Sequence, residues 1–346
     1  MTHTKKIALI YFLFLPVLSF ASEKTQIRLG VLAYGTVNWE LNALEQQGLL
    51  ETEKYQLKIT RMANPQAGKV ALLSGSVDMI VADWVWVSRQ RSTGKDYTFY
   101  PYSNTIGALV LAKNSQIKSL QDLAGKKLAI AGGELDKNSL LLGAVMQKQG
   151  LTGVLNSTEK IYGAPALLAH QLKQERVDAL LTYWHYAARL EAAGYPVLMT
   201  GADLLQQLEV KEKVPSIGYV FSGAWAKQHK EAVLKFLEYT QQMKNKLCTN
   251  DNIWQGLQKL TRAATEQESQ LLRQRYCAGR VTSWGEKEQT AAELVYQNLK
   301  KMSQQRLTGN AEQIEQGTFW RKGGEMVWAD LYPKSCILKS FECGCG

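Results

Sequence analysis

The chain has 346 residues, of which 45% are hydrophobic and 21% charged, a composition that excludes disordered, collagen-like and coiled-coil proteins. This length is enough for two domains with substantial cores, and five cysteines are too few for a disulfide-built scaffold. The formal charge of +10, from 41 Lys and Arg against 31 Asp and Glu, raises the question of nucleic-acid binding. The basic residues are spread over polar helical stretches without a basic block, so we expect no nucleic-acid partner.

The N-terminal segment has the parts of a secretory signal peptide. Two lysines precede an apolar run over residues 7–20, and small residues at Ser19 and Ala21 stand where a signal peptidase reads them. The run is 14 residues long and contains Pro16, whereas a helix that spans a bilayer needs about 20 apolar residues. Residues 1–21 are therefore predicted to be a signal peptide that is cleaved off, which would leave a periplasmic protein. The alternative is that this segment is retained as a membrane anchor.

The cysteines raise questions of disulfides and metal binding. An exported protein meets an oxidising compartment, and Cys248 and Cys277 lie in one helical region, where either a bridge or two free thiols fit the sequence. The C-terminal tail carries three more cysteines and no histidine (Cys336, Cys343 and Cys345). Because a structural metal site needs about four nitrogen or sulfur ligands, we expect no metal site, no cofactor and no chemistry in this tail.

From residue 26 onward, short β-branched runs alternate with glycine-bearing loops and amphipathic helices. In chain order, the first half predicts a strand over Gln26–Leu32, a helix from about Trp39 to Gly48 with Asn38 as its N-cap, a strand over Tyr55–Thr60, a helix after Asn64 up to Leu73, and a buried strand that ends at Asp83 and Trp84.

The same pattern starts again after Thr105. It predicts a strand over Gly107–Ala112, a short capped helix over Ser119–Gly125, a strand over Lys127–Ala131, a helix up to Gly150, a strand around Lys160–Tyr162, a helix after Pro165, a strand from Val177 to Tyr183, a last strand over Gly218–Ser222, and helices from Ala224 to about Ser303. Strands that alternate with helices imply parallel pairing in α/β sheets, and the two similar halves imply two similar lobes.

Three phrases of the sequence carry a family resemblance: VDMIVAD over residues 77–83 after LLSGS, SLQDLAGKKLA over 119–129, and VDALLTY over 177–183. In this order they resemble the type II periplasmic solute-binding proteins of ABC transporters, in particular the branch for nitrate, sulfonate, taurine and thiamine-pyrimidine precursors (NMT1/SsuA-like). The resemblance implies an α/β fold of two Rossmann-like lobes, joined by two hinge strands around a ligand cleft. It also implies delivery of the ligand to an ATP-driven permease in the inner membrane.

The resemblance and the pattern together divide the chain into segments. We expect a signal peptide over residues 1–21, a discontinuous first lobe over 22–104 and 216–320, a second lobe over 105–215, and a C-terminal tail over 321–346. We expect the protein to act as a monomer.

Polar and aromatic residues follow the predicted strands. Since ligands of open α/β sheets bind outside the carboxyl ends of the strands, we expect these residues to line the cleft between the lobes: Tyr34, Trp39, Asn64, Asp83, Trp84, Gly133, Glu134, Asp136, Tyr183, Trp184 and His185. Core packing is the alternative for the aromatic residues, for Trp39 and Trp86 in particular. The expected binding is dominated by Asp83 and by the rings of Trp84 and Tyr183.

Aromatic walls beside carboxylates suit a flat or cationic, nitrogen-containing organic ligand, through stacking and cation–π attraction. A sulfonate-like ligand remains the alternative, because Lys137 and Arg61 offer the charged donors that such an anion needs.

Two other classes of function compete with transport. An enzyme similar to the thiamine-pyrimidine synthases of this branch would use a histidine and a cysteine-rich segment, which FECGCG at residues 341–346 resembles superficially. The signal peptide, the position of these cysteines in the tail, and the scattering of the histidines (His3, His170, His185 and His229) argue against it, so we expect no catalytic residues. The second competitor is a periplasmic accessory or sensor protein, with the same fold, that serves a dehydrogenase or a receptor.

Overall fold

A computed structural model describes residues 24–320 of the chain. The predicted signal peptide over residues 1–21 and the tail cysteines Cys336, Cys343 and Cys345 lie outside the described residues. Within them, no helix is both long enough and apolar enough to cross a membrane.

The first sheet has five strands in the order β2-β1-β3-β10-β4. Its central strand β1 (Thr25–Leu32) pairs in parallel with β2 (Tyr55–Met62) and β3 (Met79–Ala82). The strand β10 (Ile217–Ser222) then runs antiparallel to β3 and to β4 (Tyr97–Ser103).

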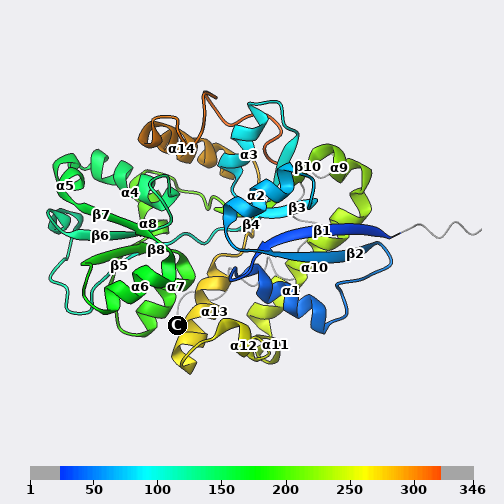
Figure 1. Cartoon of the computed structure of the whole chain (residues 1–346), viewed down its shortest axis with the longest axis horizontal. Helices are drawn as coiled ribbons and strands as arrows, with labels where there is room; N and C mark the ends of the chain where they lie inside the picture. Colours follow the sequence, from blue (N-terminus) through cyan, green and yellow to red (C-terminus); the bar gives the residue numbers. More distant parts are fainter. Residues whose placement is uncertain (1–23, 321–346) are drawn as a thin grey trace, which may run out of the picture.

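The second sheet repeats this arrangement with the order β7-β6-β8-β5-β9. Here β6 (Lys127–Ala131) pairs in parallel with β7 (Glu159–Gly163) and β8 (Ala179–Thr182), while β5 (Ala108–Leu111) runs antiparallel to β8 and β9 (Val197–Thr200). Figure 1 shows the two sheets side by side, each in its own lobe. The predicted pair of similar α/β lobes is confirmed.

The prediction of parallel pairing throughout is wrong for one strand in each sheet. Both β5 and β10 are entered directly from the other lobe rather than through a helix on their own sheet. The crossover helix that makes neighbouring strands parallel is therefore missing before these two strands, and each runs against its neighbours.

Helices cover both sheets. The first lobe contains α1 (Val37–Gln46), α2 (Pro65–Leu73) and α3 (Trp84–Arg91); the second contains the 3-10 helix η1 (Leu120–Leu123), α4 (Lys137–Lys148), α5 (Thr152–Ser157), α6 (Pro165–Lys173), α7 (Trp184–Ala192) and α8 (Gly201–Gln207). The C-terminal part adds α9 (Gly223–Gln228), α10 (Lys230–Thr249), α11 (Asp251–Gln255), α12 (Gln258–Thr261), α13 (Glu266–Ala278) and α14 (Glu286–Ser303).

The predicted cap of the first helix is also wrong. Asn38 lies inside α1, whose N-cap is Thr36. The amide of Asn38 instead donates to the carbonyls of Leu32 at 2.8 Å and Gly35 at 2.7 Å, so it closes the loop between β1 and α1.

The C-terminal helices contact both lobes. The sequence left open whether Cys248 and Cys277 are bridged or free, and in the structure they form a disulfide that joins α10 to α13. Helix α13 packs against α7 and α14 packs against α4, so that both reach the second lobe; in Figure 1 they lie below and above the junction of the lobes.

Two chain segments cross between the lobes, over residues 104–107 and 209–216. They lie side by side, because the Ser216 N–H donates to the Ser103 carbonyl at 2.8 Å. On the second lobe, a Cβ at Gly107 would lie 2.0 Å from the Thr182 carbonyl oxygen, so only glycine allows this approach. The hinge is thus held closely against both sheets.

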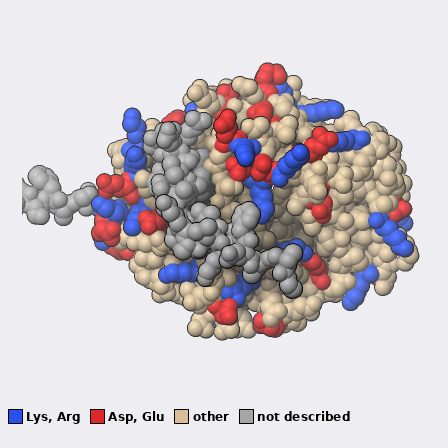
Figure 2. Space-filling view, turned by 180° about the vertical axis from the view of Figure 1, so that it is seen from behind, with Lys and Arg blue, Asp and Glu red and all other residues tan. Residues whose placement is uncertain are grey.

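Lys and Arg side chains intermingle with Asp and Glu on the face shown in Figure 2, without a continuous basic area on that face. This distribution is the one expected if most of the net charge belongs to solvated helical surfaces.

Candidate functional site

Side chains at the carboxyl ends of the parallel strands meet between the two lobes. Asp83 follows β3 and caps α3, since its carboxylate accepts a hydrogen bond from the Trp86 N–H at 2.9 Å. The same carboxylate lies 3.7 Å from the ammonium of Lys69 on α2 and 3.4 Å from that of Lys137 on α4. The ion pair with Lys137 joins the first lobe to the second.

The pKa of Asp83 follows from its charged and hydrogen-bonded partners. Burial by itself raises the pKa of Asp83, but the ammonium groups of Lys137 and Lys69 and the Trp86 N–H lower it to about 2. Burial lowers the pKa of Lys69, which Asp83 opposes. Asp83 is therefore ionised at neutral pH, and it faces one lysine of each lobe.

On the second lobe, Tyr183 follows β8 and lies over the loop after β6. A Cβ at Gly132 would be 3.4 Å from the Tyr183 hydroxyl and 3.5 Å from a carboxylate oxygen of Asp136, which places both side chains beside this glycine. Asp136 caps α4 by accepting the N–H groups of Asn138 at 3.0 Å and Ser139 at 3.2 Å. Burial raises the pKa of Asp136. Burial and the charge of Asp136 raise the pKa of Tyr183 to about 12, so its hydroxyl remains a hydrogen-bond donor.

His185 is the most unusual polar group of this region. Both of its ring nitrogens are buried and have no hydrogen-bond partner among the described residues. Its ring centroid lies 4.6 Å from that of Tyr186 and 5.6 Å from that of Trp184. Burial, with a smaller effect of the nearby Arg189 charge, lowers the pKa of His185 to about 3, so the imidazole is neutral.

Tyrosines from both lobes complete the arrangement. Tyr34, in the loop after β1, is about half exposed, and it lies close enough to Tyr183 and Tyr186 for their charges to influence one another's pKa. The structure thus brings together Tyr34 and Asp83 of the first lobe with Asp136, Tyr183 and His185 of the second.

The remaining predicted residues lie elsewhere. Trp84 is 2% exposed and donates its indole N–H to the Pro215 carbonyl at 2.8 Å, so it belongs to the core. Trp39 is 4% exposed, and Trp184, which is partly buried, packs edge-on against it at 5.9 Å. These indoles join the lobes by packing and do not form the expected aromatic wall of a cleft.

The other predicted site residues, Asn64, Gly133 and Glu134, are exposed at the surface. Asn64 is exposed and caps α2, and Gly133 is exposed beside open space. Glu134 is exposed and forms two hydrogen bonds with the guanidinium of Arg306, at 2.6 and 3.0 Å. Of the three, Gly133 is joined to the group through its backbone, since its carbonyl accepts a hydrogen bond from the Asp136 N–H at 2.9 Å.

Sequence reasoning missed Lys69 and Tyr186. Tyr186 lies three residues after Tyr183, so both occupy one side of the first turn of a helix; that spacing was a usable signal. Lys69 is the single cation of α2, but only the packing of α2 beside β3 brings it to Asp83. Within residues 24–320, no group of three or more His, Cys, Asp or Glu could hold a metal ion.

Comparison with known proteins gives a family match and similar folds. The profile of the family described as NMT1/THI5 like matches residues 44–246. Similar solved structures include the alkanesulfonate-binding protein SsuA from Xanthomonas axonopodis pv. citri bound to MOPS, with 17% identity and a TM-score of 0.65 over 87% of this chain and 100% of that chain. The periplasmic aliphatic sulphonate binding protein SsuA from Escherichia coli has 18% identity and a TM-score of 0.66 over 87% and 95%.

The periplasmic nitrate-binding protein NrtA from Synechocystis PCC 6803 is more distant, with 14% identity and a TM-score of 0.51 over 68% of this chain and 66% of that chain. No curated protein sequence matches the chain. The structural matches confirm the predicted type II periplasmic-binding-protein fold.

Proposed function

The chain belongs to the NMT1/THI5-like family, and from that premise we propose that it is the solute-binding component of an ABC-type import system. In this role it captures a small organic ligand between its lobes in the periplasm and delivers it to an inner-membrane permease. The observation that carries the proposal is the cross-lobe group at the strand ends, where Asp83 of one lobe pairs with Lys137 of the other at 3.4 Å. A ligand that contacts both partners binds best when the lobes are closed.

The charges of this group favour an anionic ligand over the cationic one that the sequence suggested. Lys69 and Lys137 both approach the Asp83 carboxylate, whereas the second acid of the site, Asp136, accepts the backbone N–H groups of Asn138 and Ser139. Two ammonium groups are therefore within reach of an anion that takes the place of Asp83. A sulfonate or carboxylate accepts charge-assisted hydrogen bonds from such lysines. The alkanesulfonate-binding structure with MOPS shares the fold and supports this choice.

The rings beside the lysines suit the rest of such a ligand. Tyr34, Tyr183 and Tyr186 offer aromatic faces with hydroxyl groups, and the neutral imidazole of His185 offers a donor and an acceptor. We assign the ligand site to Tyr34, Asp83, Asp136, Tyr183 and His185, with Lys69, Lys137 and Tyr186 added.

The same geometry supports binding rather than catalysis. The NMT1/THI5-like family includes enzymes as well as binding proteins. The similar solved structures described above, however, are named as binding proteins. His185 has a pKa of about 3, which makes it a poor base at neutral pH, because a general base works best with a pKa near the working pH.

A thermal-shift screen tests the function. The mature chain is heated with alkanesulfonates including MOPS, with carboxylates, with nitrate, and with cationic and pyrimidine compounds. A ligand at 100 times its dissociation constant adds about 2.7 kcal/mol to stability, a shift on the order of 5 °C. We expect organic anions to give such a shift and Lys137→Met to abolish it, while the matched surface variant Lys118→Met retains it. No shift with any class, or turnover of a compound that binds, would refute the proposal.

A further inference from the structure

Helix α13 is fixed to the first lobe. The disulfide between Cys248 and Cys277 joins it to α10, and the Tyr276 hydroxyl donates to the Glu40 carboxylate on α1. Helix α1 packs against both β1 and α10, so these links connect α13 to the helices that cover the first sheet. Helix α13 is therefore an extension of the first lobe.

Helix α7 of the second lobe meets α13 through two ion pairs of opposite direction. Arg189 on α7 donates to the Glu268 carboxylate on α13, and it also donates to the Thr261 carbonyl at the end of α12. In return, the Arg275 guanidinium on α13 donates to both carboxylate oxygens of Glu191 on α7, at 2.6 and 2.8 Å. Each helix thus supplies one acid and one base. We call these four side chains the clasp: Arg189, Glu191, Glu268 and Arg275.

Water reaches the clasp from a groove beside the hinge. This groove has a volume of about 720 Å³, and Glu191 and Arg275 line it together with the crossing segments over residues 104–108 and 209–214. The side chains of Arg275 and Glu191 are 41% and 31% exposed. Because ion pairs in contact with solvent are weak and screened by salt, the clasp can exchange its partners for water when the lobes separate.

The contact on the other side of the hinge is apolar. Helix α14 packs against α4 of the second lobe so closely that a Cβ at Gly143 would lie 2.9 Å from the terminal methyl of Met302. Buried side chains of both helices, such as Val145 and Val295, belong to one continuous core. Separation of α4 from α14 would expose this core to water, which makes this contact the stronger of the two.

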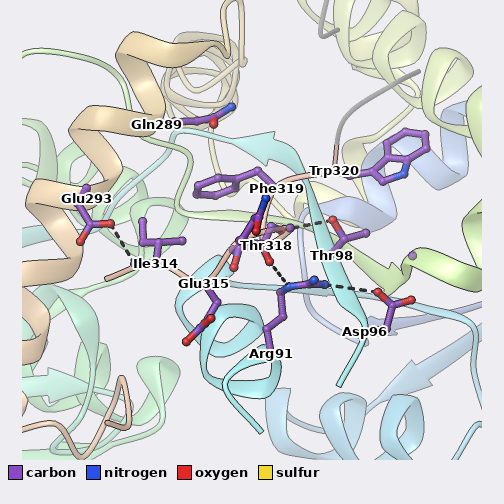
Figure 3. Close-up of a pocket in the computed structure, with 13 residues that line it drawn as sticks. Arg91, Asp96, Thr98, Gln289, Glu293, Ile314, Glu315, Thr318, Phe319 and Trp320 are labelled. Atoms are coloured by element: carbon purple, nitrogen blue, oxygen red, sulfur yellow. Dashed lines mark hydrogen bonds and ion pairs between the residues drawn. The ribbon is translucent and has the colours of Figure 1, made fainter. Parts of the chain in front are cut away.

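The chain after α14 fastens this helix to the first lobe. The Phe99 N–H donates to the Thr318 carbonyl at 2.8 Å, and the Trp320 N–H donates to the Phe99 carbonyl at 2.9 Å, so that this segment adds to the edge of β4. Figure 3 shows the segment, together with the hydrogen bond at 3.0 Å from the Ile314 N–H to the Glu293 carboxylate on α14. The second lobe therefore contacts two extensions of the first, α13 through charges and α14 through a core.

We propose that the clasp holds the lobes together in the empty protein, and that the lobes open by its release, with the apolar contact of α4 and α14 as the pivot. Relative motion of two domains is the default unless their interface is large and hydrophobic, and only the side of α14 has an interface of that kind. The rings of Trp184 and Trp39, 5.9 Å apart, separate in the same movement. The clasp thus sets the fraction of empty protein that is closed, whatever ligand binds at the strand ends.

The test measures the distance between the lobes of the mature full chain by pulsed electron paramagnetic resonance. Spin labels replace Lys58 and Lys160, which are exposed on β2 and β7. These edge strands lie at the opposite end of each sheet from the strands that enter the hinge, so opening moves them most. Attachment through non-canonical amino acids leaves the cysteines intact, and refolding from urea removes any bound ligand.

We expect a mainly short distance in the empty, otherwise unmodified chain. Arg275→Glu replaces an attraction by a repulsion and should raise the ratio of long to short distances about fivefold. The charge-swapped double variant Glu191→Arg, Arg275→Glu should restore the short distance. The matched charge reversal Lys227→Glu, at an exposed position on α9, should change nothing.

Three results would overturn the proposal. Arg275→Glu and Lys227→Glu would give the same distances, or the double variant would stay as open as Arg275→Glu. In the third case, the empty chain without these substitutions would already be mainly open. Circular dichroism spectra equal to that of the parent ensure that each variant is folded, and because no ligand is present, the outcome is separate from the proposed function.

Discussion

A buried polar cluster in the first lobe gives a prediction whose size follows from its geometry. Glu40 is fully buried, and its carboxylate accepts hydrogen bonds from the hydroxyls of Tyr102, at 2.6 Å, and Tyr276. The ammonium of Lys244 lies 3.6 Å from it, donates to the Tyr102 carbonyl at 2.5 Å, and stands 3.3 Å from the centre of the Tyr102 ring. The cluster links α1, β4, α10 and α13.

The perturbation is Lys244→Met, which leaves the charge of Glu40 buried without its cation. Breaking a buried ion pair on one side costs about 3–5 kcal/mol. Glu40→Gln instead leaves the Lys244 ammonium buried without its carboxylate partner. The double variant removes both charges. We therefore expect the double variant to be about 1–3 kcal/mol more stable than the sum of the single losses predicts, with urea unfolding followed by circular dichroism as the assay.

The pH dependence supplies an independent check. Burial raises the pKa of Glu40, and Lys244 opposes this rise. Without Lys244, the pKa of Glu40 in the folded state rises further above its unfolded value. Stability from a group of this kind is present below its unfolded pKa and lost as the pH rises through the folded pKa. The deficit of Lys244→Met should therefore be smaller at pH 5 than at pH 8. Additive losses with equal deficits at both pH values would refute the reasoning.

Three further predictions concern single features of the fold. Replacement of Cys248 and Cys277 by serine opens a loop with a sequence separation of 29 and should cost roughly 3–4 kcal/mol in urea unfolding; dithiothreitol should destabilise the parent and leave the variant unchanged. Gly107→Ala places a Cβ against the Thr182 carbonyl and should lower stability by about 1–3 kcal/mol, which an unchanged melting temperature would contradict. Trp84→Ala should lose about 3–5 kcal/mol, whereas a loss below about 1 kcal/mol would mean that Trp84 is not core.

The sequence predicts the strands and the two-lobe plan because their signals are local. The runs Lys127–Ala131 and Tyr55–Thr60 alternate with helices at a spacing that only α/β lobes explain, and both are strands in the structure. The edge strands β4 and β9 were not predicted. The run YTFYPYS of β4 contains a proline and has no helix of its own before the hinge. It forms a strand because it pairs with β10, which comes more than 110 residues later in the chain.

The site was less predictable, for a reason that Asp83 and Trp84 show. Both follow the same strand, yet a helix begins between them. The N-cap position turns the Asp83 carboxylate toward the free N–H groups of α3, whereas Trp84, as the first helical residue, turns its indole into the core. Strand ends therefore identify the region of a site, and the helix start decides which of two neighbouring residues faces it.

The charge of the site was the hardest part to foresee, since it depends on residues distant in the chain. Asp83 by itself suggests a cation as ligand. Its two lysines come from the helices after β2 and β6, and Lys137 is brought to it only by the approach of the second lobe. The proposed preference for an anion thus depends on the approach of the two lobes, and under this proposal a ligand anion competes with Asp83 for both lysines. The affinity for the anion should consequently depend on how completely it replaces the Asp83 carboxylate as the partner of Lys69 and Lys137.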